Sequence, residues 1–520
     1  MYCKQSKRTT MKYLKYILVA GLAIGSAACE KPLEETPYSV IPGEQAYNTK
    51  ADADAAVIGM YAALYPNYWM YYGGYHMVVT DMTTPMGYNT PGGDLKQMVD
   101  FAWSPANQYL QNEWRHMWSL VFRANLALEK LPGIGALDEA VKKEYLGHAR
   151  FLRALGYYDL TSLWGDVPLV LRSNIGGTAK PHRNKQAMVE AQIIEDLVAA
   201  AAALPAKQPS NREAWATQGA AYGLLCKIYL RQKNYAKVEE YARKIMATGR
   251  YDLFQPQTEG ANKLYSDLFL ESNKRDNEFI YKIMYAPTED GLNGMGVHNR
   301  PTDLDQFEGY AYYGVSLDFW WTFEDSDPRG KCFLSEYTGI TGKQYRAPKQ
   351  GETLPTNIAP MPAVYSKKFF VEKGKDPNFD GHNMPILRYA DILLCLAEAI
   401  NEQTGPSAEA IELVNQIKRR AGATELPTSG FSKETLRDKI FQERGWELVF
   451  EMKHREDLMR RGTYVEACNK YIAARKSRGA LGLANVGPEK LYFPVPQEEV
   501  NANPNITQPP IDVIEFPAIK

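Results

Sequence analysis

The chain has 520 residues, roughly three and a half domain-sized units, which is long enough to bury a large core without disulfide staples. Its 60 Lys and Arg residues against 61 Asp and Glu residues give a formal net charge of −1, and no five like charges follow one another. This balance excludes a protein that coats nucleic acid and excludes a charged tail. Tyrosine is the unusual residue, with 34 copies against 18 Phe and 9 Trp, so its distribution along the chain bears on any binding surface.

The N-terminal segment is typical of a signal peptide. Lys12 and Lys15 form a positive start, and residues 17–28 form an apolar core of 12 residues, shorter than the roughly 20 that a membrane-spanning helix needs. The core ends in Ser-Ala-Ala before Cys29, which resembles a bacterial lipobox in which the cysteine carries the lipid. We therefore expect a signal peptide over 1–28 and a mature chain anchored by lipid at Cys29. A plain secretory signal followed by a chance cysteine is the alternative.

Helical periodicity dominates the chain after this segment, and the helices come in pairs. They are expected over residues 112–130, 141–163, 191–204, 221–231, 236–248, 389–402 and 408–421. The pair joined by the short turn Asn234-Tyr235 resembles a tetratricopeptide repeat, and Gly405-Pro406 separates the helices of the last pair in the same way. The sequence therefore predicts a mostly α fold, a tetratricopeptide-like helix-pair scaffold of the α-α superhelix type.

One long stretch interrupts this helical pattern. Between residues 251 and 385, Gly, Pro and aromatic residues become frequent and the helical period fades. We interpret 29–520 as a single domain with an N-terminal helical part over 29–250, an irregular aromatic-rich insertion over 251–385, and C-terminal helices and a tail over 386–520. Loops held by a rigid scaffold usually carry the binding surface, so the insertion is expected to carry it here.

Motifs for catalysis and metal binding are absent from the sequence. It contains no HExxH, P-loop, GxSxG or GxGxxG pattern, and none of the seven His form an i, i+4 pair, so no catalytic residue, metal or cofactor is predicted. The segment 376–381 begins like a calcium loop, but its twelfth position is Leu387 where a Glu is required, which favours a polar turn. Cys226 and Cys395 lie in apolar helical runs and are expected to be small buried residues outside any disulfide framework.

Acidic residues gather on one predicted helix near the C-terminus. Glu443, Glu447 and Glu451 share a helical face, with Arg444 and Arg455 nearby. We interpret them as a structural ion-pair network, because opposite charges at i, i+4 spacing satisfy each other. A pair of catalytic carboxylates, as in a glycoside hydrolase, stays open as an alternative, since separation in space is not visible in a sequence.

Several segments together resemble the SusD/RagB family of outer-membrane lipoproteins. They occur in the family's order and are the early 33–37, the helix and exit turn EYLGHARFLRALGYYDLTSLWGDVPL at 144–169, and the later segments 388–399, 414–422, 443–451, 457–460 and 493–508. His454, where the family more often carries Arg, and Met452, where Gly is usual, are departures that affect local packing. The matching motif residues, among them Arg153, Asp159 and Arg388, are expected to hold the scaffold.

The resemblance implies a non-catalytic protein that captures an oligo- or polysaccharide at the cell surface and passes it to a SusC-like TonB-dependent transporter. It implies an outer-membrane location through the lipid anchor, and no nucleic acid or cofactor. Two alternatives remain open: a RagB-like lid that binds peptides for a peptide transporter, and an exported helical glycoside hydrolase.

Aromatic residues in aperiodic, Gly-rich stretches are the candidates for contact with a sugar, because a flat ring covers the apolar face of a sugar while polar neighbours bind its hydroxyls. Two stretches qualify, 65–103 with the residues just after it, and 310–329. The residues predicted to contact a glycan are Trp69, Tyr72, Tyr88, Trp103, Asn107, Tyr312, Tyr313, Trp320 and Trp321. Phe101, Phe319 and one of the two adjacent tryptophans are expected to be buried, since neighbouring rings do not easily face the same way.

Overall fold

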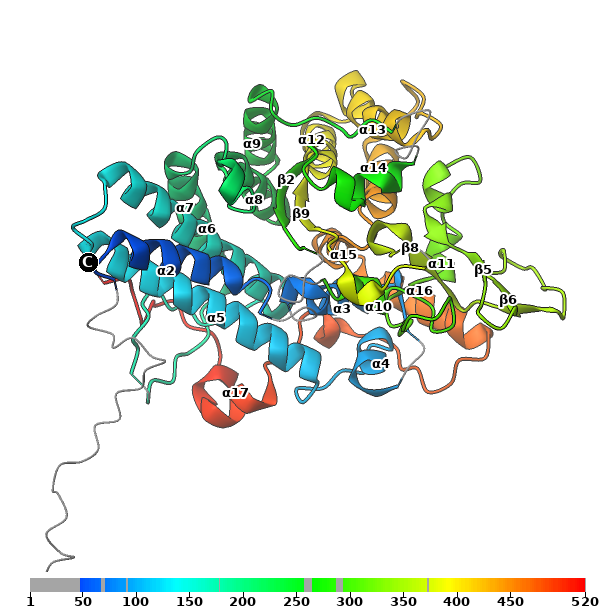
Figure 1. Cartoon of the computed structure of the whole chain (residues 1–520), viewed down its shortest axis with the longest axis horizontal. Helices are drawn as coiled ribbons and strands as arrows, with labels where there is room; N and C mark the ends of the chain where they lie inside the picture. Colours follow the sequence, from blue (N-terminus) through cyan, green and yellow to red (C-terminus); the bar gives the residue numbers. More distant parts are fainter. Residues whose placement is uncertain are drawn as a thin grey trace, which may run out of the picture. The chain divides into compact units, whose positions relative to one another are not determined.

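Long helices packed side by side form the N-terminal part of the protein. The computed structural model describes residues 47–66, 71–89, 92–176, 178–256, 264–286, 293–371 and 374–519, so the predicted signal peptide and Cys29 lie outside the described residues. The helices of this part are α2 (Lys50–Ala62), α5 (Gln108–Lys130), α6 (Glu139–Trp164) and α7 (Gln186–Ala203). α6 packs against both α5 and α7, and α2 lies along α5 (Figure 1).

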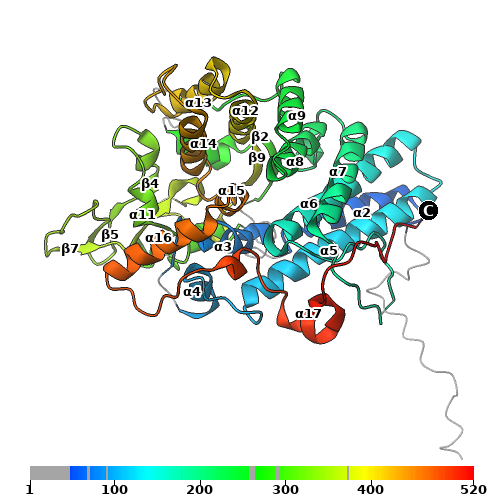
Figure 2. The ribbon, with the colours of Figure 1, turned by 180° about the vertical axis from the view of Figure 1, so that it is seen from behind.

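A second set of helices continues this stack. It consists of α8 (Gln218–Arg231), α9 (Tyr235–Ala247), α12 (Tyr389–Thr404), α13 (Ala408–Ala421) and α14 (Lys433–Glu447). α9 packs against α12 although the whole insertion separates them in sequence, and α12 in turn packs against α13 and α14 (Figures 1 and 2). Every helix that the periodicity predicts is therefore present, and the mostly α, tetratricopeptide-like fold is confirmed. In the described part of the chain, no helix is both long enough and apolar enough to cross a bilayer.

Local sequence signals set the ends of these helices. The Thr217 side chain accepts a hydrogen bond from a backbone N–H of the first turn of α8, and Ser407 does the same for α13. Gly405 ends α12 with a φ of 83°, a conformation that glycine adopts without strain. Gly156 allows α5 and α6 to approach closely, because a Cβ there would lie 3.0 Å from a methyl carbon of Val121. Single residues thus determine where these helices begin or end and how closely α5 and α6 approach each other.

Shorter elements fill the remaining sequence. The short helices are α3 (Tyr75–Val79), α4 (Gly93–Val99), α10 (Met295–His298), α11 (Leu317–Trp320), α15 (His454–Arg461), α16 (Tyr464–Ser477) and α17 (Gln497–Ala502). The strands are β1 (Gly87–Tyr88), β2 (Phe279–Ile283), β3 (Gly314–Ser316), β4 (Phe333–Leu334), β5 (Glu336–Thr338), β6 (Gln344–Arg346), β7 (Ile358–Pro360), β8 (Ala363–Ser366) and β9 (Met384–Arg388). The described residues between 251 and 385 form only short helices, short strands and loops.

Three small sheets organise the insertion. β2 pairs antiparallel with β9, which brings the two ends of the insertion together. β1, β3, β8 and β4 form an antiparallel sheet in that order, with Tyr88 opposite Gly314, so a strand from the N-terminal part joins the insertion. β5 pairs antiparallel with β6, and β6 pairs parallel with β7. The insertion is therefore fastened to the helical scaffold at both ends.

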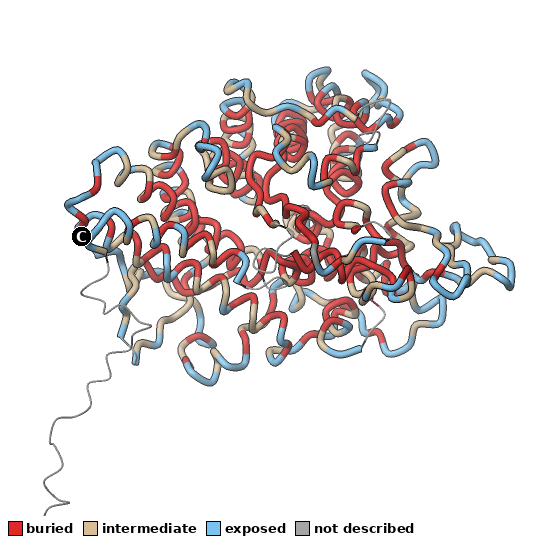
Figure 3. Tube along the Cα trace, in the orientation of Figure 1, coloured by how far each residue is buried: buried red, intermediate tan, exposed pale blue. Residues whose placement is uncertain are grey.

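The segment around Asp81 also contacts the segment around α15 directly, although the two are far apart in the sequence. Asp81 accepts hydrogen bonds from the backbone N–H groups of Met452 at 2.8 Å and His454 at 3.0 Å. The Tyr464 hydroxyl donates to the carbonyl oxygen of Thr83 at 2.7 Å. Residues about 370 to 380 positions apart are thus bonded to each other, and all of them are buried. Figure 3 shows that buried residues are concentrated in the centre of the protein.

The predicted ion-pair network exists, but its partners are distant in sequence. Arg388 donates to Glu447 at 2.9 Å and to Glu451 at 2.7 Å, and all three side chains are buried. Burial alone would raise the pKa of Glu447, but the guanidinium groups led by Arg420 and Arg388 lower it to about 2. The expected pairing of these acids at i, i+4 spacing is wrong, because their charges meet arginines from other elements.

Candidate functional site

Four of the nine residues predicted to contact a ligand are buried, so the expectation that they form an exposed surface is wrong. They are Tyr72, Trp103, Asn107 and Tyr313. One further residue, Trp69, lies outside the described residues. The other four are half-buried, with part of each ring open to solvent: Tyr88, Tyr312, Trp320 and Trp321. The predicted burial of Phe101 and Phe319 is confirmed.

Interior partners explain the burial of the first two rings. The Tyr72 hydroxyl donates to Asp159 of α6 at 2.6 Å, so its polar tip is already satisfied. Trp103 packs edge-on against Phe493, with ring centroids 4.9 Å apart, and the guanidinium of Arg455 lies 5.8 Å from its ring. Neither ring keeps a face for a ligand.

The other two buried residues have structural roles as well. Asn107 caps α5, because its side-chain oxygen accepts a hydrogen bond from the backbone N–H of Tyr109 at 3.0 Å. Tyr313 stacks on His298, with ring centroids 5.0 Å apart and an interplanar angle of 16°. Both therefore support nearby residues instead of meeting a ligand themselves.

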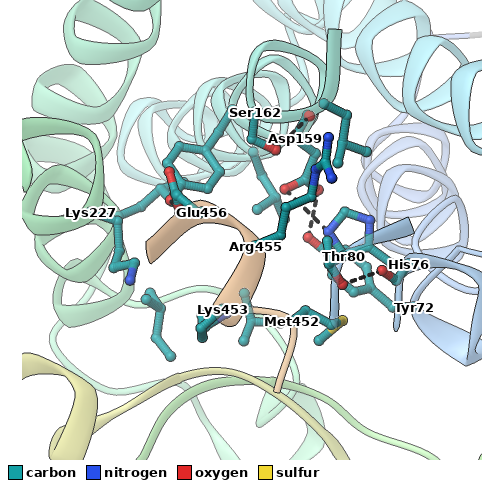
Figure 4. A pocket seen from close by; sticks show the side chains of 16 residues that line it. Tyr72, His76, Thr80, Asp159, Ser162, Lys227, Met452, Lys453, Arg455 and Glu456 are labelled. Carbon is teal, nitrogen blue, oxygen red and sulfur yellow. Dashed lines mark hydrogen bonds and ion pairs between the residues drawn. The ribbon is translucent and has the colours of Figure 1, made fainter. Parts of the chain in front are cut away.

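Tyr72 lines a cavity inside the protein, which Figure 4 shows together with His76 and Asp159. His76 lies 3.0 Å from Glu113 and 3.8 Å from Asp159, and all three side chains are buried. Burial disfavours protonation of His76, but the two carboxylates outweigh it and raise the pKa of the imidazole. The cavity has a volume of about 40 Å³, which suits water and is far below the several hundred Å³ of a ligand pocket. It is part of the polar interior.

Half-buried tyrosines gather at a different place, where α3 and the start of α5 meet the loop before β3. We call this group the tyrosine cluster: Tyr75, Tyr310 and Tyr312, backed by buried Tyr109 and His298. Tyr75 and Tyr109 have ring centroids 4.5 Å apart, and Tyr310 and Tyr312 stack at 5.2 Å with an interplanar angle of 29°. His298 lies 5.3 Å from both of the latter rings. The cluster thus brings together three partly exposed aromatic rings that each carry a hydroxyl group.

Polar groups lie directly beside this cluster. The Asn89 amide nitrogen donates to the backbone oxygen of Tyr312 at 2.9 Å, while its buried side-chain oxygen accepts no hydrogen bond from any described residue. Burial lowers the pKa of His298 to about 4, so the imidazole is neutral near pH 7. The hydroxyl of Tyr109 is also held neutral, since burial and then the neighbouring Tyr75 and Tyr312 raise its pKa. The side chains of the tyrosine cluster are therefore neutral near pH 7 and rich in hydroxyl groups.

The two adjacent tryptophans are both half-buried, in different surroundings. The Trp320 indole donates to the backbone oxygen of Gly330 at 3.1 Å and packs against the core. Trp321 lines a pocket between α11, α14, α15 and α16, and Tyr88 lines a neighbouring pocket that shares Asp318 with it. The structure thus separates Tyr312 from Trp321, which sequence reasoning had placed in one surface.

The carboxylates that the sequence offered as a hydrolase pair are all engaged elsewhere. Glu443 accepts from Arg329 at 2.6 Å, and Glu447 and Glu451 are bonded to Arg388. All three are buried. A general acid and a nucleophile must reach substrate, so these residues form a structural network and not a hydrolytic site.

Sequence reasoning missed part of the tyrosine cluster. Tyr75 and Tyr310 lie inside the two stretches that were singled out, but Tyr109 follows the α5 cap within a helical pattern and looks like scaffold. His298 lies in the one-turn helix α10 and carries no sequence signal. The signal that was available is the repeated Tyr in Tyr310-Ala-Tyr312-Tyr313, of which the first and second tyrosines are half-buried and the third is buried.

Comparison with known proteins agrees with the fold. Two family models match the chain, "Starch-binding associating with outer membrane" over residues 33–230 and "SusD family" over residues 277–511. SusD-like protein P25 of Formosa agariphila is 23% identical, over 95% of this chain and 98% of that protein. Starch-binding protein SusD of Bacteroides thetaiotaomicron is 23% identical, over 80% of this chain and 81% of that protein.

A solved structure, described as a laminarin binding SusD-like protein, has a TM-score of 0.69 and 21% identity, covering 89% of this chain and all of that one. Its helical fold matches the one described above. The two matching models cover both halves of the scaffold, from before α2 to beyond α17. The chain therefore belongs to the SusD/RagB family.

Proposed function

We propose that this protein captures an oligo- or polysaccharide at the cell surface and passes it, without catalysis, to a SusC-like TonB-dependent transporter. The observation that carries the proposal is the tyrosine cluster, which gathers three half-buried rings of the kind that cover the apolar side of a sugar. The hydroxyl groups of these tyrosines can form hydrogen bonds with the hydroxyls of a sugar. Affinity would come from stacking and selectivity from these hydrogen bonds.

The named relatives support a carbohydrate ligand. One family model is described as starch-binding, and two of the similar proteins are named for starch and laminarin. The five described residues of the tyrosine cluster supply no cation, which favours a neutral saccharide over an acidic one, since an anion would need a cation to replace its water. The neutral imidazole of His298 behind the rings agrees with this.

Anchoring is part of the same proposal. Cys29 would carry the lipid, and the residues between it and the first described residue, Tyr47, would link the anchor to the folded part. A lipid anchor holds the protein at the outer membrane while leaving the tyrosine cluster accessible. The anchored protein would then lie beside the transporter and deliver the glycan to it.

Isothermal titration of the mature chain against a panel of neutral and acidic oligosaccharides and of peptides tests the proposal. We expect at least one neutral glycan to bind and no reducing ends to be released. Binding of peptides with no binding of any glycan would instead establish the RagB-like alternative. Release of reducing ends that a single Asp or Glu substitution abolishes would establish the hydrolase.

A further inference from the structure

A second pocket lies apart from the tyrosine cluster, where α11 faces α14, α15 and α16. Its volume is about 620 Å³, within the range of about 300–1,000 Å³ that is usual for small-molecule sites. None of its lining residues belongs to the tyrosine cluster. We call it the Trp321 pocket; its aromatic lining consists of Phe319, Trp321, Phe441, Trp446, His454 and Tyr471.

The two indole rings of the Trp321 pocket have no N–H group left for a ligand. The Trp321 indole donates to the backbone oxygen of Pro348 at 2.9 Å, and the Trp446 indole donates to the Thr322 hydroxyl at 3.0 Å. These hydrogen bonds fix both ring planes. The rings therefore offer rigid apolar surface, which a flat apolar face of a ligand would cover at little cost in side-chain entropy.

His454 is the polar group of this pocket. Its side chain lines the pocket, the residue is only 8% exposed, and in the part of the chain that the structure describes neither ring nitrogen makes a hydrogen bond. The ring is held between Phe319, at 5.6 Å, and Phe441, at 5.8 Å, and the backbone N–H is bonded to Asp81. Burial lowers the pKa of this imidazole to about 4. At neutral pH it therefore presents one donor nitrogen and one acceptor nitrogen, as a hydroxyl group requires.

Two ion pairs flank the pocket, and the Lys470 side chain lines it as well. Arg444 donates to Asp457 at 2.8 Å behind His454, and Arg478 donates to Asp318 at 2.9 Å at the edge of the pocket. A purely apolar ligand would leave the nitrogens of His454 without partners. A ligand with both an apolar face and hydroxyl groups can cover the aromatic rings and form hydrogen bonds with His454 and Lys470.

We propose that the Trp321 pocket is a second saccharide-binding subsite, which takes a sugar ring stacked on the aromatic walls with a hydroxyl bonded to His454. The inference rests on the proposed function, because it gives the same class of ligand a second place to bind. Gln442 lines the pocket as well and supplies an amide within it. A glycan-binding protein with two separate subsites holds a long chain more firmly than either subsite alone.

The test uses the neutral oligosaccharide that binds best in the panel, with titration calorimetry for the number of sites and tryptophan fluorescence for the Trp321 pocket. Tyr312→Ala removes a ring of the tyrosine cluster. His454→Phe keeps a packed ring but removes both nitrogens. Ala474→Trp fills the pocket from α16 and leaves His454 unsubstituted. Circular dichroism melting confirms that each variant is folded, and Ala474→Trp decides the matter if His454→Phe does not fold.

We expect two binding sites in the natural chain and one in each single variant. When Tyr312→Ala is combined with either pocket variant, binding should be at least tenfold weaker than in the natural chain. The fluorescence change on binding should persist in Tyr312→Ala and disappear in His454→Phe. Wild-type binding by both pocket variants, with all binding lost in Tyr312→Ala, would overturn the second subsite and leave the proposed function intact. No binding of any glycan by the natural chain would overturn both.

Discussion

Arg420 on α13 lies 2.6 Å from Glu278, measured from Nη1 to Oε2, although 142 residues separate them in the chain. Both side chains are buried, and Arg388 at the end of β9 contacts the same carboxylate. Glu278 stands immediately before β2, so this ion pair ties the start of the insertion to the helix stack that follows it. A buried charge without its partner is costly, so the fold depends on the completeness of this network.

The first prediction compares two neighbouring arginines. The Arg420 side chain is 1% exposed, whereas the Arg419 side chain is 52% exposed and pairs with acids at the surface. Arg420→Met should lower the free energy of unfolding by about 3–5 kcal/mol, because it leaves buried carboxylates uncompensated. Arg419→Met should lower it by less than about 1 kcal/mol. Denaturant titrations of both variants measure the difference, and equal losses would contradict the structural role of the network.

The second prediction concerns the tyrosine cluster. Tyr312→Ala removes a half-buried stacked ring and should weaken glycan binding at that site about tenfold, the equivalent of about 1.4 kcal/mol. Tyr345→Ala is the matched control, because Tyr345 also belongs to a stacked tyrosine pair, with Tyr337 in the β5–β6 hairpin. Calorimetry on the two variants distinguishes the surfaces, and the reverse order of effects would place the glycan on the hairpin.

The third prediction is a pH dependence of stability. His454 has a folded pKa of about 4, below the usual 6.5, so its contribution to stability is complete above pH 6.5 and is lost as the pH falls toward 4. His454→Phe should reduce the slope of unfolding free energy against pH in this window by up to about 1.4 kcal/mol per pH unit. His116 and His298, with pKa values also lowered to about 4 by burial, should keep part of the slope.

Gln442→Ala is the control for that experiment, since Gln442 lines the same pocket and does not titrate. Its slope should equal that of the natural chain. An unchanged slope in His454→Phe would show that the imidazole is protonated equally in the folded and unfolded states.

The fourth prediction concerns the cysteines. Cys226, Cys332, Cys395 and Cys468 are all buried as free thiols. Burial raises the pKa of Cys395 and of Cys468 to about 12, which suppresses the reactive thiolate. With Cys3→Ser and Cys29→Ser combined, a thiol reagent should label none of the remaining four in the native protein and all four after denaturation in guanidinium without reductant. Fewer than four labels in the denatured protein would reveal a disulfide.

The fifth prediction tests the anchor. Cells fed a clickable palmitate analogue should label the natural chain and should not label Cys29→Ser, because that residue is the expected lipid acceptor. Cys332→Ser changes a buried cysteine of the folded part and should keep the label. Labelling of both variants would place the lipid elsewhere, and loss of membrane association should accompany loss of label.

The helical scaffold could be predicted because its signals are local. The turn at Asn234-Tyr235 and the break at Gly405-Pro406 fall where α8 ends and α9 begins, and where α12 ends and α13 begins. The partners of the acidic helix could not be predicted. Glu447 meets Arg388 59 residues earlier in the chain, and no periodicity connects a helix to a strand end at that distance.

The candidate site was harder to predict from the sequence than the scaffold was, for a related reason. Tyr72 and Tyr75 are three residues apart in one Gly-rich stretch, yet Tyr72 is bonded to Asp159, 87 residues later, and Tyr75 stays half-buried. Tyr312 and Tyr313 are neighbours that both contact His298, yet Tyr312 is half-buried and Tyr313 is buried. A lack of helical periodicity indicates that a segment is irregular, but exposure depends on which distant element covers it.

The bonds from Asp81 to the backbone of Met452 and His454 also govern how the protein folds. The turn that carries Asp81 is made early in synthesis, and its partners are made about 370 residues later. Such long loops make folding slow, because the entropy of closure is lost before the contacts form. Any truncation before α15 should therefore leave an N-terminal fragment with an exposed, unfinished surface, and neither half of the scaffold is a module that could be exchanged between proteins by itself.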